Sequence, residues 1–369
     1  MTSRERLTRI FQNKETDRPA LKLWGLHPGI KPLHRDYLPV IEKALRLTDL
    51  FVEASSPFDL LAGRNRDEQI EDRPTDSPLW IDRVTTLHTP KGSLRSVHRL
   101  STVGEPGYCI EYPVRQPRDI DKLLSIPYRP FPLSMDRYLK AVADVGDRGV
   151  AAFHLAHAAY GLQDLCGSEN IAYLKADAPD LVNEIIGVFA KRVAEHAKAV
   201  LSAGYKPIFY WYGPELFIPP LMSPTDFEQY VFHYDKPLCD LIHNGGGHIW
   251  VHCHGKVTQF VPRFIEMGAD VLNPLEPPSK NGDADLEALV ARYGNQIGWE
   301  GNIEMQALQE GNKESVCADI NACVDAGAKS GRFVLCHSSG FMEYPNPTAQ
   351  YIDNLLQYLD YGHQKVCSL

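Results

Sequence analysis

The chain has 369 residues, of which 44% are hydrophobic and 23% are charged, and its formal net charge is −9. This balance is typical of a globular protein, and without a Lys/Arg block it disfavours nucleic acid and basic membrane patches as partners. The polar stretch Met1–Thr8 lacks the apolar core of a signal peptide, and no apolar run approaches the roughly 20 residues of a membrane span. Eight scattered cysteines favour reduced thiols, so we expect a cytoplasmic protein.

The first irregular region of the chain runs from about residue 55 to residue 132. It is rich in Pro, Arg and Asp, and it contains two patches of alternating polarity, 79–87 and 107–113. Alternation with a period of two is typical of strands with one exposed face. We therefore interpret this region as an insertion that contains a β-hairpin and lies at the mouth of a larger domain. Nothing in it resembles an independent domain, so residues 1–369 are expected to form a single domain.

From Val150 onward, strand-like and helix-like segments alternate. Strands are predicted at 150–154, 206–212, 248–254, 269–273, 296–300 and 332–336, and helices at 171–175, 181–203, 286–293, 314–326 and 348–359. Ser223 is expected to cap a further helix, because Pro224 and Asp226 follow it. This rhythm predicts a parallel sheet. The number of units, and the lack of a Gly-rich dinucleotide fingerprint, favour a (β/α)₈ TIM barrel over an open sheet.

The run from His248 to Gly255 ends one of the predicted strands with two histidines. Side chains alternate along a strand, so His252 and His254 should share a face while Cys253 points to the other. Two imidazoles at the carboxyl end of a barrel strand suit a divalent metal site. A pair of histidines that are only hydrogen-bonded to neighbours explains the same pattern equally well.

Other polar residues follow the predicted strands at equivalent places. These are His154, His157, Glu215, Asn273, Glu276, Glu300, Asn302, Glu304, Cys336 and His337. We interpret Cys336 as a third metal ligand and Glu215 as a fourth ligand or a general base. Glu215, Glu276 and His337 are the candidate catalytic residues. The alternatives are a buried free thiol at Cys336 and loop carboxylates that are bonded to nearby amides.

The stretch from Trp211 to Gly340 resembles the uroporphyrinogen decarboxylase superfamily, and within it the zinc-dependent, corrinoid-linked methyltransferases. The residues that carry this resemblance are Ser223-Pro224…Phe227, His252-x-His254-Gly255, Gly268-Ala269-Asp270, Gly301-Asn302, the strand that ends at Cys336, and the N-terminal Arg4-Glu5-Arg6…Asp17-Arg18-Pro19. The likeness covers most of the chain except the region from about residue 55 to residue 132.

The resemblance implies that zinc is held at the barrel mouth by a His-x-Cys-Gly motif and a later Cys. His252 and Cys336 match two of these ligands, whereas residue 254 is His rather than Cys. An imidazole in place of a thiolate leaves a more electron-poor metal, which favours an ether, alcohol or amine donor over a thiol. The resemblance therefore implies methyl transfer between a small substrate and a corrinoid on a separate partner protein, and the His at position 254 favours an O-methyl donor. It leaves open the direction of transfer and whether the chain forms a homodimer.

Three other functions are compatible with the sequence. A decarboxylase without metal would use an early Arg-x-x-x-Arg motif for substrate carboxylates, but this place reads Trp24-Gly25-Leu26-His27-Pro28-Gly29. A metal-dependent hydrolase would usually carry His-x-His on an earlier strand. A barrel that only binds a ligand is the third alternative.

Several aromatic residues could form the barrel wall or a pocket for a methoxyarene: Tyr210, Trp211, Tyr212, Phe217, Phe341 and Tyr344.

Overall fold

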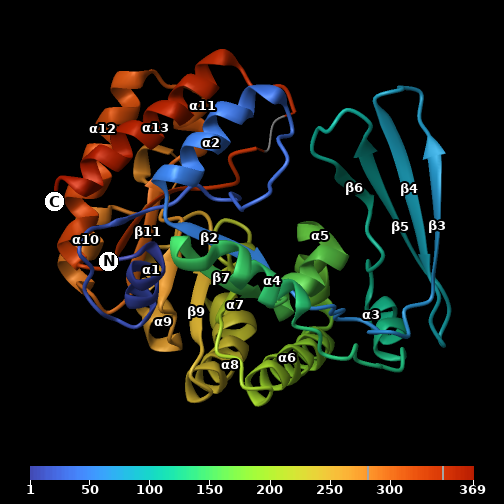
Figure 1. Ribbon diagram of the computed structural model, residues 1–369. Helices are drawn as coiled ribbons and strands as arrows, with labels where there is room; N and C mark the ends of the chain where they lie inside the picture. Colours follow the sequence, from blue (N-terminus) through green and yellow to red (C-terminus); the bar gives the residue numbers. More distant parts are fainter. Residues whose placement is uncertain (281, 343–344) are drawn as a thin grey trace.

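A parallel sheet of eight strands forms the centre of the computed structural model, which describes residues 1–280, 282–342 and 345–369 (Figure 1). The strands are β1 (Ala20–Leu21), β2 (Leu50–Ala54), β7 (Gly149–His154), β8 (Ile208–Tyr212), β9 (His248–His252), β10 (Val271–Asn273), β11 (Gly298–Ile303) and β12 (Phe333–His337). They pair in chain order, and β12 pairs with β1. The Asp49 N–H donates to the Leu21 carbonyl at 2.7 Å, which joins β1 to β2. The predicted (β/α)₈ barrel is confirmed.

Helices surround the barrel strands (Figure 1). They are α1 (Ser3–Phe11), α2 (Leu38–Leu47), α3 (Pro117–Leu124), α4 (Asp136–Val145), α5 (Ala158–Asp177), α6 (Pro179–Ser202), α7 (Pro224–Phe227), α8 (His233–Asn244), α9 (Val261–Met267), α10 (Leu286–Tyr293), α11 (Met305–Glu310), α12 (Lys313–Gly327) and α13 (Ala349–Cys367). Ser223 caps α7, because its hydroxyl accepts the Asp226 N–H at 3.3 Å, as predicted. Within the described residues, no helix has the length and apolar character needed to cross a membrane.

Alternation along the strands divides the buried residues into two cores. On β9, Ile249 and Val251 pack outward against the helices, and Trp250 packs inside the barrel. Leu7 and Phe11 of α1 belong to the inner core. Helix α1 therefore covers the amino ends of the strands and leaves the carboxyl ends for the functional residues.

The insertion forms an antiparallel sheet beside the barrel (Figure 1). Its strands are β3 (Glu68–Pro74), β4 (Trp80–Leu87), β5 (Leu94–Ser101) and β6 (Tyr108–Glu111), paired in that order. The sheet is larger than the predicted hairpin. All of β3 is exposed, so it lacks the apolar alternation by which a strand is found in a sequence. Arginine–aspartate pairs hold neighbouring strands together, as between Arg83 and Asp72 at 2.7 Å.

Candidate functional site

The two histidines at the end of β9 meet at the barrel mouth. The ring centroids of His252 and His254 are 4.4 Å apart, and the ring planes are nearly perpendicular, at 89°. His252 is buried, whereas the side chain of His254 is 35% exposed. Cys253 lies in the outer core. The alternation expected from the sequence is therefore confirmed.

A side-chain oxygen fixes each ring through its Nδ1 atom. Nδ1 of His252 lies 2.6 Å from Oδ1 of Asn273, and Nδ1 of His254 lies 2.6 Å from Oε1 of Glu276. The Gly255 N–H donates to the other oxygen of Glu276 at 2.5 Å. Because both partners of the rings are acceptors, Nδ1 carries a proton in each ring. Neither Nε2 atom is hydrogen-bonded to a described residue, and oriented rings of this kind are typical of metal ligands.

A second carboxyl group, Glu304, interacts with this pair from the end of β11. Burial and the negative charge of Glu276 raise the pKa of Glu304 to about 7. Burial alone would raise the pKa of Glu276, but the hydrogen bond and charge of His254 lower it. Burial alone would lower the pKa of His254, but Glu276 raises it. Near neutrality the group therefore holds one charged pair and one carboxyl group that can give up a proton.

One side-chain oxygen of Glu304 is left without a hydrogen-bond partner in the described part of the chain. This atom, Oε1, is buried. The residue also lines a cavity of about 450 Å³ between α10 and α12, together with Asn302 and Cys323. A buried polar atom without a partner is uncommon in proteins and is compatible with a site that becomes satisfied when substrate binds.

Glu215 also belongs to this group. It follows β8 in a 3₁₀ turn over Pro214–Phe217, and its carboxylate accepts the Gly213 N–H at 3.0 Å. Burial raises the pKa of Glu215, and the charge of His254 opposes this shift. The structure thus brings together His252, His254, Glu215 and Glu276 from the predicted site.

Cys336 points into the barrel beside Lys22 and Glu300, away from this group. It lies in the inner core, where burial and the charge of Glu300 raise the pKa of its thiol. Among residues 1–280, 282–342 and 345–369, no three or more His, Cys, Asp or Glu side chains are arranged to hold a metal ion. The predicted ligand set fits zinc only in part: the two ring nitrogens are suitable donors, but the thiol is engaged elsewhere.

His337 lies outside the barrel, because the next residue along β12 faces the opposite way from Cys336. Its Nε2 accepts the Trp24 N–H at 3.3 Å, and its Nδ1 donates to the Ser339 carbonyl at 2.6 Å. Its ring packs against Tyr358 of α13. Burial lowers the pKa of His337 to about 4. Its position supports the β12–α13 packing, and the structure does not bring it to the predicted catalytic group.

A buried network below the histidines was not found from the sequence. Lys22 donates to Oε1 of Glu300 at 2.7 Å, and Trp250 Nε1 donates to Oε2 at 3.0 Å. The amide of Asn273 donates to the same carboxylate at 3.2 Å and accepts from His252. The one sequence feature that could have indicated this network is Lys22, a lysine within the apolar run around β1. The network fixes the amide orientation of Asn273 and, through it, the orientation of the His252 ring.

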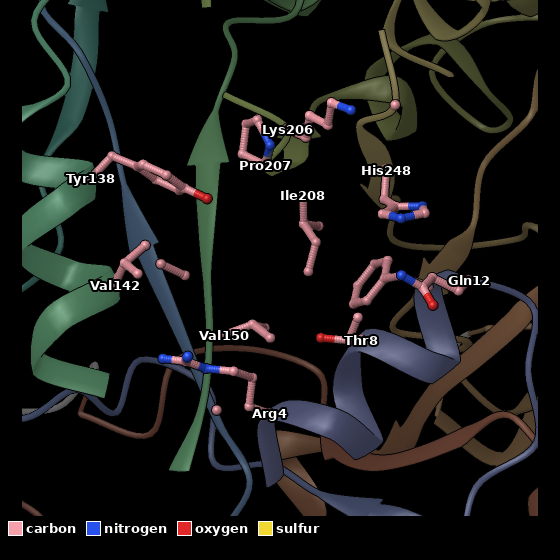
Figure 2. Close-up of a pocket in the computed structure, with 14 residues that line it drawn as sticks. Arg4, Thr8, Gln12, Tyr138, Val142, Val150, Lys206, Pro207, Ile208 and His248 are labelled. Carbon is pink, nitrogen blue, oxygen red and sulfur yellow. The ribbon is translucent and has the colours of Figure 1, made fainter. Parts of the chain in front are cut away.

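Figure 2 shows a cavity of about 410 Å³ at the other end of the barrel. It lies between Arg4 and Thr8 of α1 and the first residues of the strands, among them Ile208 and His248. Chemistry in TIM barrels takes place at the carboxyl ends of the strands, so we do not assign the reaction to this cavity. Tyr344, one of the aromatic residues considered for a substrate pocket, falls outside the described residues.

Comparisons with known proteins agree with this architecture. The family model Uroporphyrinogen decarboxylase (URO-D) matches residues 110–348. Curated uroporphyrinogen decarboxylases of Prochlorococcus marinus are similar in part. That of strain MIT 9312 is 25% identical over 157 residues, which are 40% of this chain and 41% of the relative. That of strain MIT 9515 is 24% identical over 183 residues, 47% of this chain and 48% of the relative. The chain thus spans about half the length of these relatives.

A solved structure described as a methyltransferase from Methanosarcina mazei is similar over 98% of both chains. Its TM-score is 0.60 and its sequence identity is 14%, a likeness that concerns the fold. The barrel, its order of strands and the match over residues 110–348 lead to one assignment. The chain belongs to the uroporphyrinogen decarboxylase family.

Proposed function

We propose that this protein is a methyltransferase that moves a methyl group between a small O-methyl substrate and a corrinoid carried by a separate protein. The observation that carries the proposal is the group of His254, Glu276 and Glu304, which combines a charged pair with a carboxyl group of pKa about 7. The methyltransferase fold of the structural neighbour supports it. The lack of an arginine pair after β1 argues against a polycarboxylate substrate.

Loss of a methyl group from an ether leaves an alkoxide or phenoxide that needs a proton. The O–CH₃ bond breaks, the methyl group passes to the acceptor, and Glu304 gives its proton to the leaving oxygen. Glu304 then becomes a carboxylate beside His254. The negative charge of Glu276, held by His254 and the Gly255 N–H, keeps the proton on Glu304 until it is needed. The corrinoid would supply the nucleophile that accepts the methyl group.

In this proposal, the two imidazole rings are the only predicted ligands that would still hold zinc. The Nε2 atoms of His252 and His254 would hold the ion once His254 has given up its Nε2 proton, and Glu215 is the nearby carboxylate. Zinc would supply Lewis acidity at the leaving oxygen. Because the thiol of Cys336 does not fit this set, we derive no step through the metal.

Glu304→Gln tests the proposal, because glutamine keeps the shape of the side chain but cannot give up a proton. With a methoxyarene and cob(I)alamin as reactants, we expect demethylation to slow by about 10²- to 10⁴-fold. The wild-type rate should fall as pH rises through about 7, since Glu304 then loses its proton. Glu314→Gln, at an exposed position of α12, is the matched control. Full activity of Glu304→Gln, or turnover of uroporphyrinogen by the wild type, would refute the proposal.

A further inference from the structure

A row of aromatic rings lies beside the two histidines at the barrel mouth. The rings of His154 and Tyr212 are stacked with centroids 5.2 Å apart, and His154 lies 5.1 Å from Tyr210. Trp24 packs edge-on against His252 at 4.6 Å. Tyr212 is 39% exposed. Burial lowers the pKa of His154 to about 4, so its ring is uncharged at neutral pH. The row therefore offers uncharged aromatic surface to a ligand.

One carboxylate, Glu53 of β2, anchors two of these rings by their edges. Its Oε1 accepts Trp24 Nε1 at 2.6 Å, and its Oε2 accepts the Tyr210 hydroxyl at 3.1 Å. Both donors are neutral, and the described residues include no ion-pair partner for Glu53. Lys22 is paired with Glu300 and acts on Glu53 only as a more distant charge. Glu53 is also exposed at the mouth, so its charge is presented to a ligand together with the aromatic surface.

In the metal-free protein, the nearby pair of His254 and Glu276 does not cancel the charge of Glu53. His254 is paired with Glu276, which leaves no net charge from these two groups. A cation gains both from a carboxylate and from the face of an aromatic ring, whereas an anion is repelled by both. We propose that the methyl donor is a small ether that carries a protonated amine, and that Glu53 and the rings of Trp24 and Tyr212 bind this ammonium group. This inference rests on the proposed function and names its substrate class.

A series of donors that differ only in charge tests the inference. We would compare para-methoxybenzylamine, para-methoxybenzyl alcohol and para-methoxybenzoate, which present the same methyl ether on the same ring. We expect kcat/KM to fall by about tenfold or more from the amine to the alcohol, and again to the benzoate, as charge pairing and cation–π contact are lost. Glu53→Gln should raise KM for the amine by a similar factor, so that the preference for the amine over the alcohol is lost. A preference for the benzoate would overturn the inference.

Two controls make the outcome specific. Glu314→Gln removes a distant carboxylate and should keep the wild-type preference. Lys256 is an exposed cation two residues after His254, and Lys256→Gln should keep the preference too. If benzoate were preferred and Lys256→Gln abolished that preference, the mouth would be a site for anions. Denaturation midpoints of the three variants would show whether each is folded.

A binding measurement separates this inference from the proposed function. Benzyltrimethylammonium has no methyl ether but presents the same kind of charge to the aromatic row. Calorimetry should show that it binds the wild type at least tenfold more tightly than Glu53→Gln. Such binding without turnover of any ether would support the cation site and refute the methyltransferase. Turnover of ethers without this binding difference would refute the cation site and leave the methyltransferase standing.

Discussion

The buried pair of Lys22 and Glu300 allows a sharp prediction of stability. Their side chains are 1% and 3% exposed, and the charged atoms are 2.7 Å apart. Lys22→Met would leave the Glu300 carboxylate with neutral donors only, namely Trp250, Asn273 and the Cys336 thiol. An unpaired buried charge of this kind typically costs about 3–5 kcal/mol.

Urea denaturation of Lys22→Met, Glu300→Gln and the double variant measures this cost. The double variant removes both charges, so we expect it to be more stable than Lys22→Met by about 2 kcal/mol or more, with an unchanged dependence on urea. The comparison is a double-mutant cycle and isolates the pair from the packing of the lysine stem. A single variant that loses less than about 1 kcal/mol, or a double variant no more stable than it, would refute the reasoning.

Three further predictions concern separate parts of the molecule. The raised pKa of His254 means that its pair with Glu276 stabilises the fold below the ordinary histidine pKa of 6.5 and ceases to do so as pH rises through the raised value. His254→Gln should therefore lower the urea midpoint more at pH 6 than at pH 9; an equal loss would contradict this. Ser223→Ala should cost about 1 kcal/mol through loss of the α7 cap, and an unchanged midpoint would argue against it. Elemental analysis should find zinc in Cys253→Ala but not in His254→Ala, and zinc retained in the latter would exclude the ring as a ligand.

The fold was largely predictable because it depends on local patterns. The apolar runs around Phe209, Val251 and Val334 lie close to the observed strands, and the helix at 286–293 has the predicted bounds. The order of strands then follows from chain order alone. The insertion was harder to predict, since β3 is held by cross-strand pairs such as Arg83 with Asp72 rather than by a buried face. A pattern of burial cannot reveal a strand that buries little.

In the candidate site, some features follow from the local sequence and others depend on contacts between distant strands. Alternation along one strand was enough to place His252 and His254 together, and Cys253 apart from them. Whether Cys336 reaches those rings depends on the tilt of strands across the whole barrel, and only the tertiary structure shows that Lys22 and Glu300 surround its thiol instead. Local sequence thus determined which residues stand at the strand ends and which way they face. The closed barrel decided which of them meet, because residues far apart in the chain become neighbours only when the sheet curls and the helices pack around it.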